Sequence, residues 1–144
     1  MRVLVQRCLK SSVVINRRLV NEIGHGMVVL VGFSKTDDLD NVKKMIKKIV
    51  NLRIFDDEKN MMNKSIKEVH GSILSISQFT LYADTSKGCR PSYFEALNYS
   101  DAEKLYDKFN ELLSKEVPVK TGVFGSDMQI KLINDGPITI MLEN

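Results

Sequence analysis

Short groups of apolar, mostly β-branched residues separated by polar residues fill the first part of the chain. Residues 3–5, 13–15 and 19–23 hold three such groups, and each has the length of a strand. Asn16-Arg17-Arg18 lies between the second and third groups and is predicted to form a hairpin tip. The run at residues 27–33 is apolar without alternation, which predicts a central strand covered on both faces.

Two later segments have the periodicity of helices. Apolar residues recur at helical spacing across residues 41–53, while Lys43, Lys44, Lys47 and Lys48 fall on the opposite side. The polar loop at residues 34–40 supplies several candidate N-caps for this helix. Ser100 and Glu103 resemble a capping box, which predicts that a second helix begins at Ser100 and stops before Pro118.

Strand patterns return at residues 72–81, 119–124, 128–133 and 138–142. Two helices and about seven strands predict an α/β fold in which one layer of helices packs on a mixed sheet. So many strands in a chain of this length predict two sheet layers, which makes a layered β/β/α arrangement. No repeat or linker divides the sequence, so residues 1–144 are predicted to form a single domain.

Composition and charge exclude several classes of protein. The chain is 43% hydrophobic and 27% charged, as in soluble globular proteins. No apolar run approaches the length of a membrane span, and the first residues lack the apolar core of a signal peptide, so we expect a cytoplasmic protein. Cys8 and Cys89 form no metal-binding or disulfide pattern, and a net charge of +3 permits a polyanionic partner without demanding one.

The segment from Ile133 to Ile140 combines strand-forming residues with a strong turn signal. Asn134-Asp135-Gly136 favours positive φ, and Pro137 fixes its own φ and has no N–H to donate. A sharp turn there leaves carbonyl groups that must meet water, another chain or a ligand. The pattern alone predicts a plain hairpin.

Conventional catalytic side chains are scarce. His25 and His70 lie outside any nucleophile or metal motif, so structural or solvated roles are favoured for both. Cys8 is predicted to be a packed thiol, and Cys89 lies between Lys87 and Arg90 without a neighbouring base. Residue chemistry by itself leads only to a soluble α/β domain with two unusual loops.

Two short signatures in combination, Ser77-Gln78-Phe79-Thr80-Leu81 and Asn134-Asp135-Gly136-Pro137, resemble those of the D-aminoacyl-tRNA deacylase family. This family consists of homodimeric hydrolases that remove D-amino acids from tRNA. The resemblance extends from the first strand to the last, through landmarks such as Gly24-His25-Gly26-Met27, Lys87-Gly88-Cys89-Arg90-Pro91-Ser92 and Thr121-Gly122-Val123-Phe124-Gly125. Cys8 and Ile138 stand where family members more often have Val.

The resemblance implies that the Gly136–Pro137 peptide is cis and enters the pocket of the other subunit. Its two carbonyls would collide with an L side chain, whereas a D side chain would point away and glycine would have none to collide. The residue matching Arg7 would hold this peptide by donating hydrogen bonds to it. The backbone, rather than a side chain, would then reject L-amino acids.

The resemblance also implies which residues form the substrate pocket. Ser77, Gln78, Phe79 and Thr80 would line it, with the main-chain N–H groups of Phe79 and Thr80 close to the ester carbonyl. Phe124 and Met128 would complete the wall and admit the terminal adenosine. The Thr80 side chain is the less favoured nucleophile, because an aminoacyl ester is already activated and the ribose 2′-hydroxyl can position water.

The expected function is therefore hydrolysis of D-aminoacyl-tRNA, and of glycyl-tRNA mischarged on tRNA(Ala), without a metal or cofactor. Two alternatives stay open. One is a non-catalytic RNA-binding dimer that uses the Lys43–Lys48 face, which would otherwise be a solvated face. The other is a thiol-dependent hydrolase built on Cys89.

Overall fold

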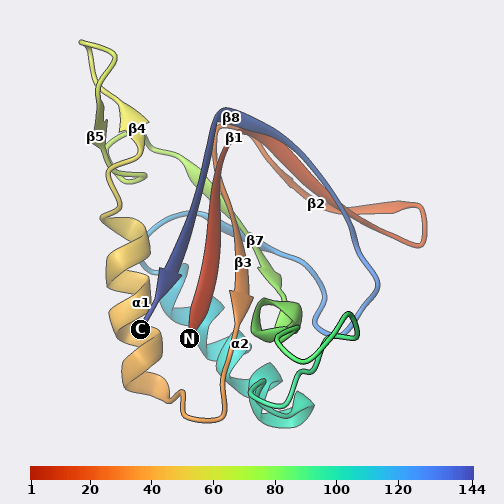
Figure 1. Cartoon of the computed structure of the whole chain (residues 1–144). Helices are drawn as coiled ribbons and strands as arrows, with labels where there is room; N and C mark the ends of the chain where they lie inside the picture. The colour runs from red at the N-terminus through yellow and green to blue at the C-terminus, as the bar shows by residue number, and fades with distance from the viewer.

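Six strands form one hydrogen-bonded sheet in the computed structural model, which describes residues 1–144 (Figure 1). Its order is β2-β1-β3-β6-β7, and β8 also pairs with β1. The strands are β1 (Arg2–Ile15), β2 (Arg18–Ile23), β3 (Gly26–Gly32), β6 (Ser72–Ser77), β7 (Val119–Thr121) and β8 (Gln129–Glu143). The remaining elements are α1 (Leu39–Val50), α2 (Tyr99–Leu113), the 3₁₀ turn η1 (Phe79–Tyr82) and a small hairpin of β4 (Phe55–Asp56) and β5 (Met62–Lys64).

Two strands are longer than the sequence pattern predicts. β1 joins the first two predicted strands into one, and β8 runs through residues 129–143 without the predicted hairpin. Cys8 pairs with Asn134 and Gln6 pairs with Thr139, so the residues between Asn134 and Thr139 bulge out opposite Arg7. The hairpin prediction is wrong because pairing with β1 continues on both sides of the turn residues.

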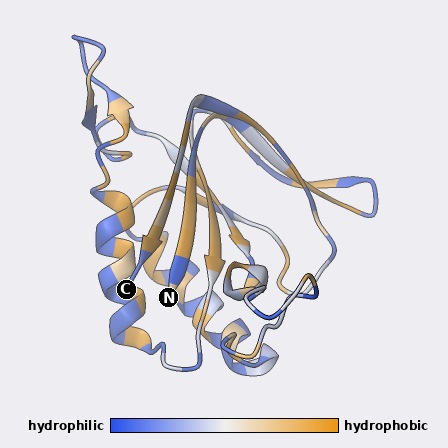
Figure 2. Ribbon diagram, viewed as in Figure 1, coloured by the Kyte–Doolittle hydropathy of each residue, from blue (hydrophilic) through white to orange (hydrophobic).

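The sheet bends, because the first half of β1 pairs with β3 whereas its second half pairs with β2. Helices α1 and α2 cover one face around a core of 21 buried residues that includes Val5, Val29 and Phe109. On the other face, the bent ends of β1 and β8 enclose a smaller cluster around Val13 and Leu74. The helix layer is as predicted, and both β layers belong to one sheet rather than two. Figure 2 shows orange apolar segments along the strands and on the sheet-facing sides of the helices.

Both helices are held at their N-termini by capping side chains. Asp38 caps α1 by accepting hydrogen bonds from the amides of Asp40 and Asn41. Asn98 caps α2 by accepting from the amide of Asp101, so α2 begins at Tyr99. The predicted capping box at Ser100 is wrong, because Asn98 already satisfies an amide of the first turn. Neither helix is long and apolar enough to cross a membrane.

Strands β3, β6 and β7 run parallel, so their carboxyl ends share one edge of the sheet. β6 ends at Ser77 and continues into η1, although the pattern predicts a strand up to residue 81. β7 ends at Thr121 and leaves residues 122–128 as a loop, although a strand to residue 124 is predicted. Both loops therefore lie at the edge where α/β proteins commonly bind ligands.

Candidate active site

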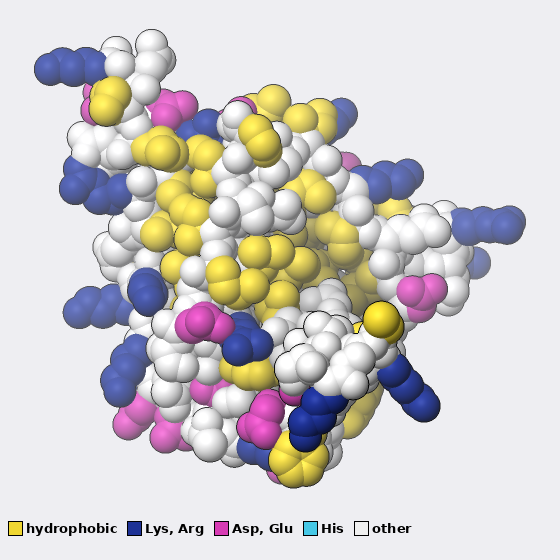
Figure 3. Space-filling view, in the orientation of Figure 1, with side chains coloured by type: hydrophobic (Ala, Val, Ile, Leu, Met, Phe, Trp, Pro, Cys, Tyr) yellow, Lys and Arg dark blue, Asp and Glu magenta, His cyan; other side chains and the backbone are white.

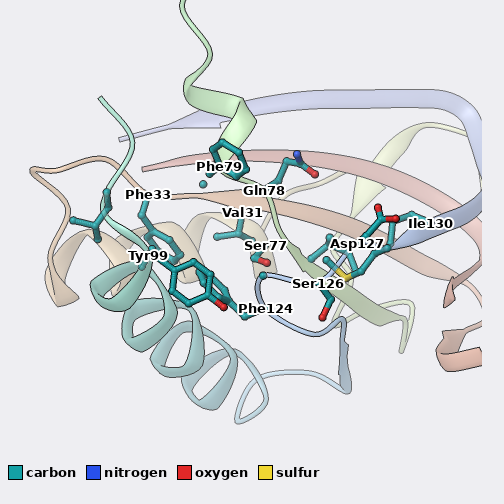
Figure 4. A pocket seen from close by; sticks show the side chains of 16 residues that line it. Val31, Phe33, Ser77, Gln78, Phe79, Tyr99, Phe124, Ser126, Asp127 and Ile130 are labelled. Atoms are coloured by element: carbon teal, nitrogen blue, oxygen red, sulfur yellow. The ribbon is translucent and has the colours of Figure 1, made fainter. Parts of the chain in front are cut away.

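A cavity of about 600 Å³ opens at this edge of the sheet (Figure 4). Its floor is formed by the ends of β3 and β6, and its walls by η1, the start of α2 and the loop after β7. Most of the lining is apolar, with a few polar groups on the walls, which is the usual character of a small-molecule site. The lining residues are Val31, Gly32, Phe33, Ile76, Ser77, Gln78, Phe79, Leu97, Tyr99, Ala102, Phe124, Gly125, Ser126, Asp127, Met128 and Ile130.

Five of the six predicted substrate-binding residues line this cavity. Ser77, Gln78 and Phe79 come from the end of β6, and Phe124 and Met128 come from the loop that faces them. The sixth, Thr80, lies one residue further along η1 and is exposed outside the lining. Its hydroxyl accepts a hydrogen bond from the Gln78 side-chain amide, and no histidine or carboxylate is hydrogen-bonded to it.

The first two amides of η1 have no acceptor within the chain, and Phe79 lines the cavity whereas Thr80 lies just outside it. Gln78 N–H still donates to the Val31 carbonyl at 2.7 Å, as in the parallel ladder. Phe79 and Thr80 follow at the start of a 3₁₀ turn, where the turn contains no acceptor for their N–H groups. Neither amide donates to a loop carbonyl or a side chain elsewhere in the chain. Two adjacent N–H groups in this position can stabilise an oxyanion.

The opposite wall depends on a close contact between Tyr99 and Gly125. Gly125 has φ +70°, and a Cβ there would lie 2.2 Å from the Tyr99 hydroxyl oxygen. The Tyr99 ring packs edge-on against Phe124 with centroids 5.0 Å apart, and Tyr106 contacts the same ring at 5.7 Å. Phe124 is therefore clamped between two tyrosines at the start of the loop.

Below this wall, Tyr106 anchors α2 to the sheet. Its hydroxyl donates to the Ser75 carbonyl on β6 at 2.8 Å, and burial raises the pKa of Tyr106. The raised pKa keeps the phenol neutral and able to donate at neutral pH. The bond fixes the distance between α2 and β6, which form two sides of the cavity.

Sequence reasoning missed several of the residues that line the cavity, among them Tyr99, Phe33, Ser126 and Asp127. The sequence pattern does not point to Tyr99, because it predicts that α2 starts at Ser100, after Tyr99. Asn98, a strong N-cap residue, was the signal that could have placed Tyr99 at the first helical position. Asp127 adds the one carboxylate of the lining, on the same loop as Phe124.

Gly136 and Pro137 lie far from the cavity of their own chain. Their peptide is cis, as the resemblance implies, and both residues are exposed in the bulge of β8. The bulge lies opposite Arg7, which pairs with Met27 near the start of β3. The cavity begins at Val31, four residues further along that strand, or about 13 Å at 3.3 Å per residue.

Arg7 is buried beside the bulge, with 6% of its surface exposed. Its Nη1 donates to the Ile54 carbonyl at 2.7 Å and lies 3.3 Å from an Asp56 oxygen. Its Nε lies 2.8 Å from an Asp135 oxygen but is poorly aligned, so this contact is an ion pair rather than a hydrogen bond. The predicted hydrogen bonds from Arg7 to the Gly136–Pro137 peptide are not formed in the single chain. Arg7 instead holds the preceding residue, Asp135.

The other candidate side chains lie away from the cavity. His25 packs edge-on against Phe55, and neither His25 nor His70 lines the cavity. Cys8 is buried in the smaller core cluster, whereas Cys89 is exposed on the loop after η1. The four lysines of α1 are exposed on its outer side, where Lys43 pairs with Asp40. No group of three or more His, Cys, Asp or Glu side chains is placed to hold a metal ion.

Known proteins resemble this chain in sequence over almost its whole length. The sequence profile of the D-Tyr-tRNA(Tyr) deacylase family matches residues 4–143. A D-aminoacyl-tRNA deacylase of Clostridium novyi (strain NT) is 50% identical over 145 residues, which cover 100% of this chain and 97% of that protein.

Two solved structures share the fold. The structure of a c-Myc DNA Unwinding Element Binding Protein superposes with a TM-score of 0.96 at 38% identity, covering 100% of this chain and 99% of the other. The structure of a probable eukaryotic D-amino acid tRNA deacylase superposes with a TM-score of 0.81 at 20% identity, covering 98% and 97%. By the extent of these matches, the chain belongs to the D-Tyr-tRNA(Tyr) deacylase family.

Proposed function

We propose that this protein hydrolyses the ester bond of D-aminoacyl-tRNA in the cytoplasm and releases the free amino acid and tRNA. Glycyl-tRNA mischarged on tRNA(Ala) is the proposed second substrate. The observation that carries the proposal is the pair of amides at Phe79 and Thr80, which have no acceptor within the chain and follow each other at the rim of a mostly apolar cavity that Phe79 lines. Family membership supports the same assignment.

In the proposed reaction, water attacks the ester carbonyl carbon while the Phe79 and Thr80 amides stabilise the developing oxyanion. The bond from this carbon to the ribose oxygen then breaks, and the proton lost by the water passes to the departing ribose oxygen. Ser77 and Gln78 line the amino-acid side of the cavity, and Phe124 and Met128 contact the terminal adenosine. The ester is an activated acyl group, so positioning and backbone donors supply much of the rate enhancement. We do not assign the Thr80 hydroxyl as the nucleophile, because its hydrogen-bond partner is the Gln78 side-chain amide, which cannot act as a base.

We assign chiral selection to the Gly136–Pro137 peptide of a second copy of the chain. In a single chain, the cavity lies about 13 Å further along β3 than the residue that pairs with Arg7, which is too far for the Gly136–Pro137 peptide to contact a ligand there. In a homodimer, the exposed bulge of one copy would enter the cavity of the other and leave no space for an L side chain. Exposed apolar residues on β1 and β8, Leu9, Ile133 and Met141, give such a dimer apolar surface to bury.

The chemical part of the proposal is tested by release of tyrosine from D-tyrosyl-tRNA. We expect Thr80→Ala to keep most of the wild-type turnover, because backbone amides stabilise the oxyanion. Abolished turnover in a correctly folded Thr80→Ala protein would assign the nucleophile to this hydroxyl. Cys89→Ser serves as a matched test of the thiol alternative and should be fully active, since Cys89 lies outside the cavity.

A non-catalytic RNA-binding dimer is the competing function, and its candidate surface is the exposed lysine side of α1. It predicts tRNA binding that weakens steeply with salt and no release of amino acid. Ester cleavage by the purified wild-type protein would exclude it. Salt-sensitive binding without cleavage would instead favour it over hydrolysis.

A further inference from the structure

A second hollow adjoins the cavity at Ser126. It has a volume of about 500 Å³ and is lined by Ile15, Asn16, Arg18, Val20, Val123 and Ser126. Ser126 lines the cavity as well, so the two spaces lie next to each other along the loop after β7. We call this second hollow the hairpin groove, because its outer wall is the hairpin between β1 and β2.

The walls of the hairpin groove are tied together. Asn21 on β2 donates a hydrogen bond from its side-chain amide to the Thr121 carbonyl, at 2.7 Å, at the end of β7. This bond links the hairpin to the strand that leads into Val123 and Ser126. The groove therefore has a fixed width and does not depend on loose packing between two loops.

Two unpaired cations stand at the hairpin tip. Arg17 and Arg18 are exposed, and neither takes part in an ion pair. Asn16 and Arg17 have φ of 49° and 65°, and Ile15 pairs with Arg18, which defines a tight two-residue turn. Glycine is the favoured residue at the second position of such a turn, yet this chain places a long cation there. Figure 3 shows Lys and Arg atoms at the end of this projecting hairpin.

The groove presents both a cation and apolar surface, and a nucleotide can use both. Arg18 can bind a phosphate through its planar fork of donors. Val20 and Val123 are 38% and 46% exposed, so they present apolar surface that could cover the face of a base. An aminoacylated RNA whose terminal adenosine contacts Phe124 and Met128 must leave the cavity, and the hairpin groove adjoins the cavity at Ser126, on the same loop as these two residues.

We propose that the hairpin groove binds the nucleotide that precedes the terminal adenosine of the RNA substrate. Arg18 contacts the phosphate that joins the two nucleotides, Val20 and Val123 contact the base, and Arg17 contacts the next phosphate outward. This inference rests on the proposed deacylase function and adds the surface by which the RNA, beyond its last nucleoside, is held.

Three substrates of increasing length test it: the D-tyrosyl ester of adenosine, the same ester on a dinucleotide, and D-tyrosyl-tRNA. In the wild type, kcat/KM should rise when the second nucleotide is added. Arg18→Gln should reduce this gain about tenfold. In the same variant, the plot of log kcat/KM for the dinucleotide against log salt concentration should be shallower by about 0.7. Arg17→Gln should lower kcat/KM on tRNA alone, and Lys59→Gln, on the distant β4–β5 hairpin, is the matched control for loss of one charge.

The outcomes separate the groove from the chemistry. A wild type that cleaves none of the three esters overturns the proposed function. A wild type that cleaves them, with an Arg18→Gln protein that loses activity equally on the nucleoside and the dinucleotide, overturns the groove alone. No change on the dinucleotide also overturns it. A change of oligomeric state in Arg18→Gln, measured by sedimentation, would show that the groove is a contact between protein chains and overturn its role with RNA.

Discussion

Gly125 lets the Tyr99 hydroxyl approach the backbone of the loop that carries Phe124 and Met128. A side chain at this position meets Tyr99 oxygen and ring atoms within 3 Å, and the backbone is in the left-handed region that L residues avoid. The chemistry of the site is mainly backbone amides, so the residues that determine it most strongly are those that fix the backbone. Side chains with familiar catalytic roles contribute little to this cavity.

Substitution Gly125→Ala should therefore damage both stability and activity. We expect a loss of about 1–3 kcal/mol in the free energy of unfolding from the strained backbone and the displaced Tyr99 ring. The displaced ring should also raise KM for D-tyrosyl-tRNA. Chemical denaturation and steady-state kinetics measure the two effects, and Gly24→Ala, where a Cβ meets nothing within 4 Å, is the control. If Gly125→Ala and Gly24→Ala had the same stability and the same KM, the proposed role of the close contact between Tyr99 and Gly125 would be contradicted.

Cys8 makes stability depend on pH in the alkaline range. Burial, with a further contribution from the Asp135 charge, raises the pKa of the Cys8 thiol from 9.0 to about 11. Between these values the unfolded thiol ionises while the folded thiol stays neutral, so stability falls as pH rises from 9 to 11. The contribution is about 3 kcal/mol at most. Denaturation midpoints of wild type and Cys8→Val should diverge over this window, and parallel curves would contradict the assignment.

Among the elements, α2 shows how a cap places a site. Asn98 accepts from the Asp101 amide and donates its own amide to the Asp101 carboxylate, which sets the helix start at Tyr99. Tyr99 then faces the cavity from the first turn. A helix beginning two residues later would leave Tyr99 in the preceding loop.

Asn98→Ala should destabilise the protein by about 1 kcal/mol, the usual cost of losing an N-cap. Ser100→Ala should have almost no effect, because Ser100 is exposed within the helix rather than at its cap. Thermal or chemical denaturation distinguishes them directly. A larger loss of stability in Ser100→Ala than in Asn98→Ala would indicate that the helix starts at Ser100, as the sequence pattern predicts.

Local patterns identify most elements but not how they join. The strands at residues 27–33 and 72–77 and both helices follow from apolar periodicity alone. The length of β1 and β8 does not, because their continuity depends on pairing with each other across more than a hundred residues. The resemblance implies six substrate-binding residues, and five of them line the cavity. Tyr99 and Asp127 also line it, but their position depends on how α2 and the loop after β7 pack in three dimensions.

At the scale of the whole molecule, Arg7 connects the bulge of β8 to the rest of the fold. It bonds to the Ile54 carbonyl and pairs with Asp56 and Asp135, which come from two separate parts of the chain. It thereby orients the segment that the proposed mechanism presents to a second subunit. Its burial makes each of these contacts stronger than the same contact in solvent.

Arg7→Met should cost about 1–3 kcal/mol of stability, since it leaves the buried Ile54 carbonyl without its donor and the partly exposed carboxylates of Asp56 and Asp135 without their cation. It should also reduce the preference for D- over L-tyrosyl-tRNA, because the bulge loses its anchor. Arg53→Met is the control, since Arg53 is exposed and donates to a single carbonyl. Unchanged stereochemical preference in a folded Arg7→Met protein would argue against the role of the bulge.

Handedness is the property on which the proposed function depends most. The family assignment, the free amides and the distant bulge all lead to one expectation for the intact protein. The direct test is deacylation of matched D- and L-tyrosyl-tRNA by the wild type under identical conditions. Rapid release of D-tyrosine with L-tyrosyl-tRNA left intact is the predicted result, and equal rates on the two substrates would contradict it.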